Sequence, residues 1–121
     1  MQIKESGENY LEAILVLSDK LEHVRATDIC NYFGYSRPTV SSVIKQFKEN
    51  EYIVVDNNNY ITLTDKGMSI AKDIYEKHEA IAQILISLGV KDAIAYEDAC
   101  KLEHGISDES FNALKKHFNI K

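Results

Sequence analysis

The chain has 121 residues, of which 45% are hydrophobic and 27% are charged, and its formal net charge is −5. A chain of this length buries one modest core or two small ones, which excludes a large catalytic domain with a deep cleft. The acidic charge excludes adhesion to nucleic acid over the whole surface, so any DNA-binding face must be a local basic stripe.

The first predicted element is an amphipathic helix from Glu5 to about Leu21. Its apolar residues recur mostly at three- and four-residue steps, which is the spacing of one helix face. The opposite face carries the acidic residues Glu8 and Glu12. The apolar positions of this helix are Leu11, Ile14, Leu15 and Leu17.

Two shorter helices follow, and together they predict a helix-turn-helix. Thr27 is a suitable N-cap for a helix over 28–33, and Gly34 tolerates the positive φ that ends such a helix in a tight turn. Ser36 caps the next predicted helix, which runs to about Asn50. Its buried stripe consists of Val40, Val43, Ile44 and Phe47.

A β-hairpin and three helices are predicted for the rest of the chain. The runs 52–55 and 60–63 are β-branched and aromatic, and they flank a turn-forming segment of one Asp and three Asn residues. This pattern is typical of the wing of a winged helix. Thr64 then caps a long helix over 65–87. The last two helices are predicted from Lys91 to His104 and from Ser107 to about Phe118, with a break near Gly105.

These elements predict a mainly α protein with a small β-hairpin. We expect a winged helix-turn-helix domain over 1–70 and a helical domain over 71–121, with the boundary inside the long helix because that helix is longer than one small domain needs. The last helices carry more apolar residues than the second half can bury alone, which favours a homodimer. These residues are Leu102, Ile106, Phe111, Leu114 and Phe118.

The cysteines and the absence of export signals indicate a cytoplasmic protein. The chain has two cysteines, Cys30 and Cys100, and its start lacks the apolar run of a signal peptide. We find no stretch long enough to span a bilayer and therefore expect no membrane partner. Cys30 lies beside apolar residues and without nearby ligand types, so we expect it in the core.

The second helix of the helix-turn-helix carries a local basic stripe. Over 35–48 every charged residue is basic. Since the first turns of such a helix enter the major groove, the residues there are the candidates for reading bases. The candidates on these turns are Arg37, Pro38, Thr39, Ser41 and Ser42, and the cap residue Ser36 is expected to contribute to DNA binding beside them. Phosphate contacts are expected from Lys45, Lys48 and the hairpin tip at Asn57, Asn58 and Asn59. The alternative is a winged helix that binds only protein.

A second cluster of residues suggests a metal site. Cys100, Glu103 and His104 are spaced i, i+3 and i+4, which places their Cβ atoms about 5–6 Å apart on one helix face. His78 and Glu12 could close the site from neighbouring helices, with Asn9 one turn before Glu12. Mixed nitrogen, oxygen and sulfur ligands suit a divalent first-row transition metal. Alternatively, the three clustered residues are a buried thiol, a solvated acid and a cation at a helix end.

At this point the sequence resembles the diphtheria-toxin-repressor family of iron- and manganese-dependent regulators over nearly its whole length. The similar segments are ENYLEAI at 8–14, SRPTVS at 36–41, LTDKG at 63–67, KH at 77–78 and DACKLEH at 98–104. The resemblance implies a homodimeric repressor that binds a palindromic operator when Mn²⁺ or Fe²⁺ is loaded, and not an enzyme.

The resemblance also implies a set of metal ligands. They correspond to Glu12, His78, Cys100, Glu103 and His104. Asn9 stands where the family usually has Met or Asp, and its neutral amide is a poorer ligand than a carboxylate for a hard cation. The length of the chain is similar to that of the manganese-responsive members of the family. The cysteine at position 100 instead resembles the iron-responsive members. We favour manganese.

Two other functions stay open at this stage. The first is a winged-helix regulator that responds to a non-metal signal, such as a small organic ligand or phosphorylation. The second is a small metal-dependent hydrolase that uses Glu103 or Glu12 as a base beside a metal-bound water. A helix-rich chain of this size has little room for a substrate pocket, so we expect no small organic substrate.

Overall fold

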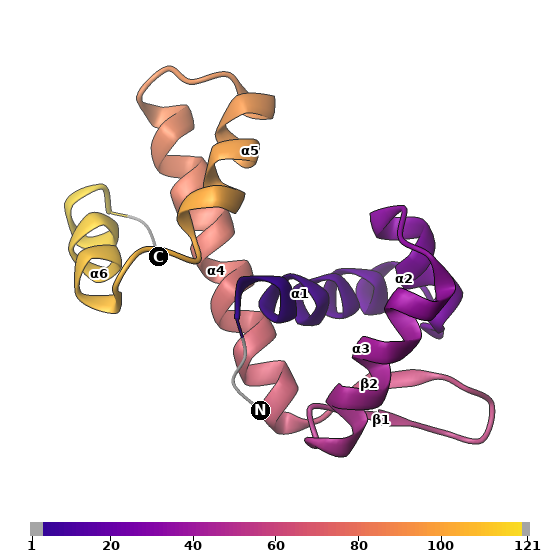
Figure 1. Cartoon of the computed structure of the whole chain (residues 1–121). Coiled ribbons are helices and arrows are strands. Elements are labelled where there is room, and N and C mark those ends of the chain that lie inside the picture. Colours follow the sequence, from indigo (N-terminus) through magenta and orange to yellow (C-terminus); the bar gives the residue numbers. More distant parts are fainter. Residues whose placement is uncertain (1–3, 120–121) are drawn as a thin grey trace. The chain divides into compact units, whose positions relative to one another are not determined.

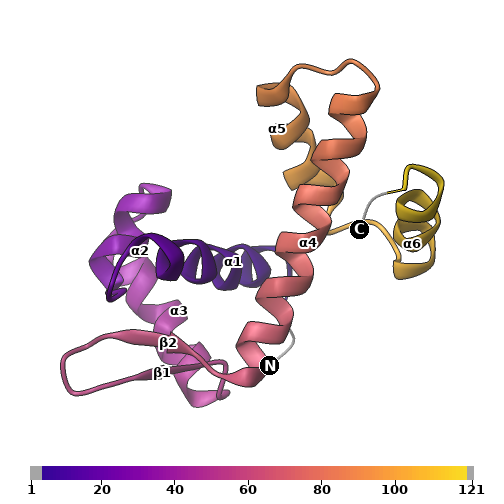
Figure 2. The same cartoon turned by 180° about the vertical axis from the view of Figure 1, so that it is seen from behind.

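The computed structural model describes residues 4–119, which form six helices and one antiparallel hairpin (Figures 1 and 2). This confirms the predicted mainly α fold class with a winged helix-turn-helix. The elements are α1 (Glu5–Lys20), α2 (Ala26–Phe33), α3 (Arg37–Glu49), β1 (Ile53–Val55), β2 (Ile61–Leu63), α4 (Asp65–Ser87), α5 (Asp92–Leu102) and α6 (Asp108–His117).

The described chain divides into two compact units, of which the first ends at Lys72 and the second begins at Asp73. This division lies inside α4. The predicted domains, 1–70 and 71–121, stay a prediction, since a division into compact units does not test whether each part is an independent domain. None of the described helices is both long and apolar enough to cross a membrane.

The first unit is built around one hydrophobic core that joins α1, the helix-turn-helix and the hairpin. Burial of these side chains stabilises the unit by removing apolar surface from water. The hairpin projects beyond α3 in both views, as a wing does (Figures 1 and 2). The buried side chains of this core include Leu11 and Ile14 of α1, Ile29 of α2, Val40 and Phe47 of α3, and Ile53 and Ile61 of the hairpin.

The turn signals of the helix-turn-helix are confirmed, but the start of α2 differs from the prediction. Gly34 has φ 74° and ends α2, and Ser36 caps α3 by accepting the Thr39 N–H. Arg25, rather than Thr27, is the N-cap of α2. The carboxylate of Asp28 accepts the Arg25 N–H at 2.8 Å, and this bond starts the helix two residues earlier than predicted.

The wing is a tight hairpin that Asp56 organises. Its strands pair in antiparallel register, with Ile53 opposite Leu63. The Asp56 carboxylate accepts the N–H groups of Asn58 and Tyr60, at 2.8 Å and 2.9 Å. An Asp side chain that satisfies the backbone in this way holds a turn without a glycine.

The second unit consists of the rest of α4 with α5 and α6. In both views α5 folds back along α4 (Figures 1 and 2), and Ala82 and Ala99 are fully buried in the core that these helices share. Phe111 of α6 joins this core, and the ion pairs Lys77–Asp108 and Lys115–Glu76 lie beside it.

The helix α5 ends at Leu102, two residues before its predicted end at His104. Glu103 keeps helical dihedral angles as the C-cap, and its N–H donates to the Ala99 carbonyl. His104 then lies in the turn that leads to Gly105. The predicted single helix face therefore holds for Cys100 and Glu103 but not for His104.

Candidate metal centre and DNA interface

Glu103 is the one charged residue that is buried among those described. Its side chain has 0% exposure to solvent. A buried carboxylate costs several kcal/mol unless positive groups or a metal compensate it. Its surroundings are therefore the first place to look for a binding function.

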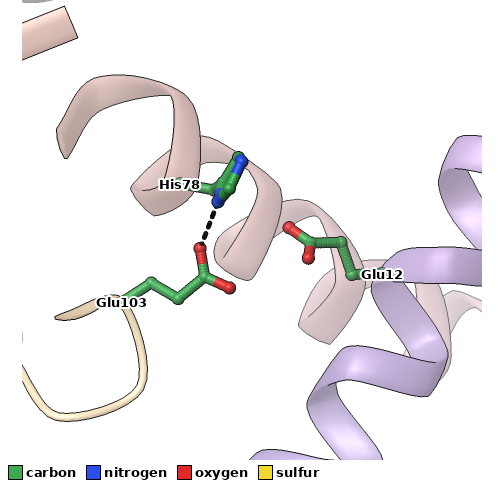
Figure 3. A group of neighbouring side chains, drawn as sticks. All are labelled: Glu12, His78 and Glu103. Carbon is green, nitrogen blue, oxygen red and sulfur yellow. Dashed lines mark hydrogen bonds and ion pairs between the residues drawn. The ribbon is translucent and has the colours of Figure 1, made fainter. Parts of the chain in front are cut away.

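Two imidazoles face the two oxygens of this carboxylate. The His78 Nδ1 of α4 lies 2.9 Å from Glu103 Oε2, as the dashed line in Figure 3 shows. The His104 Nε2 lies 3.2 Å from Glu103 Oε1, and both rings are largely buried. Oε1 accepts no hydrogen bond from the described residues. One buried acid thus lies within 3.2 Å of imidazole nitrogens from two different segments of the second unit.

The ring of His78 is held by a neighbouring aromatic residue on α5. The Tyr96 ring lies 5.5 Å from it, measured between centroids. The Tyr96 hydroxyl donates to Glu79 Oε2 at 3.2 Å. The negative charge of Glu79 raises the pKa of Tyr96 above its usual range. These contacts limit how far His78 can move.

The other predicted ligands lie in two places. Cys100 is a half-buried cysteine outside any disulfide on α5, one turn before Glu103. Glu12 and Asn9 belong to α1 of the first unit, from which Glu12 projects (Figure 3). Within the second unit the structure therefore brings His78, Glu103 and His104 together, and the roles of all six residues stay predictions.

The donors of the second unit fit a divalent transition metal. Two imidazole nitrogens and a carboxylate are ligands that such ions accept, and a thiol lies one helical turn away. A bound cation would also compensate the negative charge that Glu103 carries in a buried position. Calcium and magnesium prefer sites made of oxygen alone, so this donor set disfavours them.

The first unit contains a basic cleft between α3, the hairpin and the start of α2. Its volume is about 530 Å³. The predicted DNA-contacting residues that line it are Arg37, Ser41, Lys45, Lys48, Asn58 and Asn59. The others are exposed but do not line the cleft: Ser36 at the N-cap of α3, Pro38, Thr39 and Ser42 on α3, and Asn57 at the hairpin tip.

Two polar residues of this cleft, Arg25 and Thr27, are not among the predicted DNA contacts. Arg25 and Thr27 line it from the start of α2. The Arg37 guanidinium, which we predicted to read bases, lies 3.4 Å from the Thr27 hydroxyl and 3.3 Å from that of Ser41. A basic residue directly before the first helix of the motif was the available signal, but only the fold brings Arg25 beside α3.

Comparison with family models covers both units. Residues 2–59 match the model described as iron dependent repressor, N-terminal DNA binding domain. Residues 64–119 match the model described as iron dependent repressor, metal binding and dimerisation domain. The two matches follow the same order along the chain as the basic cleft and the buried carboxylate.

Several known proteins are similar to this chain. An uncharacterized HTH-type transcriptional regulator of Methanocaldococcus jannaschii is 34% identical over 115 residues, which cover 93% of this chain and 92% of that protein. The HTH-type transcriptional regulator MntR of Bacillus velezensis is 28% identical and is matched over 90% of this chain and 77% of its own length.

Solved structures are similar as well. That of the manganese regulator SloR has a TM-score of 0.81 at 30% identity, and the match covers 100% of this chain. The structure of the metal-dependent transcriptional regulator MtsR has a TM-score of 0.86 at 29% identity, and the match covers 94% of this chain. The chain spans 56% and 54% of the lengths of these two structures.

Proposed function

Because the chain belongs to the iron-dependent repressor family, we propose that it is a metal-dependent transcriptional repressor that binds a palindromic operator as a homodimer. The observation that carries this proposal is the buried carboxylate of Glu103 between two imidazoles, in the unit that matches a metal-binding and dimerisation domain. The basic cleft lies in the unit that matches a DNA-binding domain.

We assign the metal ligands as follows. His78, Glu103 and His104 hold the ion in the second unit, and Cys100 and Glu12 complete the site, in keeping with the family resemblance. Asn9 contributes at most a weak amide ligand. When bound, the ion supplies a divalent positive charge that is coordinated by several of these residues at once.

Manganese is the ion we favour, with Fe²⁺ as the alternative. Carboxylates such as Glu12 and Glu103 suit a hard cation, and the solved relative SloR is a manganese regulator. The thiol of Cys100 favours Fe²⁺ instead, because sulfur ligands prefer softer ions. The choice therefore rests on which ion promotes DNA binding at the lowest free concentration.

The position of Glu12 on α1 explains how a ligand could control DNA binding. Its neighbours Leu11, Ala13 and Ile14 are buried, and Leu11 and Ile14 belong to the core of the first unit. A restraint on Glu12 is therefore a restraint on the whole DNA-reading unit. Fixing this unit in each protomer lowers the entropy cost of binding two half-sites about 34 Å, or a multiple of this, apart.

The remaining parts of the proposal concern partners and location. Double-stranded operator DNA and a second copy of the chain are the partners, and no small organic substrate is needed. The relatives are transcriptional regulators, and we propose no catalytic role for the chain. We place the protein in the cytoplasm, where Cys30 and Cys100 stay reduced.

The test is a fluorescence-anisotropy titration of the full chain with a duplex from the region upstream of its own gene. The titration is made in chelator and then with Mn²⁺, Fe²⁺ or Zn²⁺, at one salt concentration. We expect the effective ion to raise DNA affinity about 10- to 100-fold. By reciprocity, calorimetry should show the duplex raising metal affinity by the same factor.

Equal binding in chelator and in metal would contradict the metal switch. The winged helix would then belong to a regulator that responds to another signal. A metal-dependent gain for a random duplex as large as that for the upstream duplex would contradict the operator.

A further inference from the structure

The cleft of the first unit is positively charged although the chain as a whole is acidic. Among its lining residues are Arg25, Arg37, Lys45 and Lys48, and none of the lining residues is a carboxylate. The chain as a whole carries a formal net charge of −5. Four cations around one cleft repel one another, so this arrangement disfavours an empty cleft and favours an anion.

Two acidic residues near the cleft, Asp28 and Asp56, direct their carboxylates to backbone N–H groups. Asp28 accepts the N–H of Arg25 at the start of α2. Asp56 accepts the N–H groups of Asn58 and Tyr60 in the hairpin turn. Both acids thus shape local structure, and neither carboxylate lines the cleft.

The side chain of Arg25 is held in place by the wing. Its Nη2 donates to the Tyr60 hydroxyl at 3.1 Å, and its guanidinium carbon lies 4.8 Å from the centroid of the Tyr60 ring. His23 stacks on the same ring at 4.0 Å, with only 2° between the planes. A cation over an aromatic face is attracted to it, so Tyr60 orders Arg25 before any ligand arrives.

An ordered guanidinium suits a phosphate group. Its planar fork donates two parallel hydrogen bonds to two oxygens, and ordering it beforehand lowers the entropy cost of binding. The cleft also offers the hydroxyl-bearing residues Thr27 and Ser41, together with Asn58 and Asn59 of the hairpin tip. Groups of these kinds contact DNA mainly at phosphates and sugars.

We propose that this cleft holds the sugar-phosphate backbone of one operator strand, with Arg25 as a phosphate-binding residue and Tyr60 as the residue that positions it. The inference rests on the proposed function, because it assumes that DNA is the ligand. It goes further by naming the sugar-phosphate backbone as the part of the DNA that this cleft binds. Contacts to phosphates fix the register of the domain without reading sequence. Arg25 therefore contributes to affinity and not to the choice of operator.

The experiment compares Arg25→Gln with Lys20→Gln in the full chain. Both substitutions remove one positive charge, but Lys20 is an exposed residue of α1 that does not line the cleft. Anisotropy is measured with metal, on the upstream duplex and on a random duplex, over a series of salt concentrations. We expect Arg25→Gln to weaken both complexes about tenfold and to reduce the salt slope by about 1. Lys20→Gln should change neither by a comparable amount.

Variants of Tyr60 test the positioning role. Tyr60→Phe keeps the ring and should bind nearly as well as the wild type, whereas Tyr60→Ala should approach the affinity of Arg25→Gln. Adding Arg25→Gln to Tyr60→Ala should then cost little more, because coupled residues are not additive. A melting temperature in chelator close to that of the wild type shows that each variant is folded.

The outcomes separate this inference from the proposed function. Wild-type affinity and slope in Arg25→Gln, with metal-dependent binding intact, would overturn the inference alone. A loss confined to the upstream duplex would also overturn it, since Arg25 would then read bases. If DNA binding ignores metal but weakens in Arg25→Gln as expected, the metal switch fails and the inference stands. A wild-type chain that binds neither duplex overturns both.

Discussion

Replacement of Glu103 by Gln is expected to lower the Mn²⁺ affinity of the protein at least about 100-fold, or about 2.7 kcal/mol. The substitution keeps the size of the side chain but removes its negative charge and converts one oxygen to an amide nitrogen. Since this carboxylate is the buried group between His78 and His104, its loss weakens the site at its centre. Calorimetric titration with Mn²⁺ measures the change in affinity. The same titration with Fe²⁺ is made in the absence of oxygen.

The control for this variant is Glu97→Gln. Glu97 lies on α5 as well, but its side chain is 70% exposed and it pairs with Lys101 at 3.7 Å. The two substitutions change the net charge equally, so only the position differs. Glu103→Gln should also lose metal-dependent DNA binding, while Glu97→Gln keeps it. Unchanged metal affinity in a folded Glu103→Gln protein would exclude Glu103 as a ligand.

Replacement of Gly67 by Ala is expected to destabilise the protein by about 2 kcal/mol or more. Helix propensity alone predicts the opposite, a gain of about 1 kcal/mol for alanine inside a helix. In the structure a Cβ at Gly67 would lie 2.1 Å from the carbonyl oxygen of Tyr52. That carbonyl also accepts the Thr64 N–H at 3.1 Å, so it joins the hairpin to the start of α4. Relief of the clash must therefore move backbone.

Thermal and urea unfolding in chelator measure this effect, with Gly105→Ala as the matched control. A Cβ at Gly105 has no described atom within 4 Å, and its φ lies outside the left-handed region. Gly105→Ala should therefore leave stability unchanged or raise it slightly. A Gly67→Ala protein as stable as the Gly105→Ala protein would show that α4 does not approach Tyr52 this closely.

Local signals predicted most of the secondary structure. Gly34 and Ser36 mark the turn of the helix-turn-helix because each satisfies a backbone requirement within a few residues of itself. The hairpin follows from two β-branched runs around Asp56, which bonds to N–H groups two and four residues later. The errors occurred where a neighbouring side chain changed a helix end, as Asp28 did for α2.

The candidate site was predicted only in part, because sequence spacing reveals neighbours on one helix but not contacts between distant residues. Cys100 and Glu103 are one helical turn apart, so their spacing alone placed them together. His78 was proposed only by residue type and family resemblance, since 25 residues separate it from Glu103. The cleft residue Arg25 had only its basic character before the first helix of the motif as a signal, because its partner Tyr60 lies 35 residues further along the chain.

The sequence by itself determined the order and type of the elements, the basic stripe of α3 and the family to which the chain belongs. These depend on propensities, caps and motif residues that act over a few positions, or on residue identity alone. Only the tertiary structure decided that Glu103 is buried between two imidazoles, that Arg25 lies over Tyr60 and that Gly67 meets a carbonyl. Burial and contact between distant residues arise when the helices pack, and no local pattern specifies them.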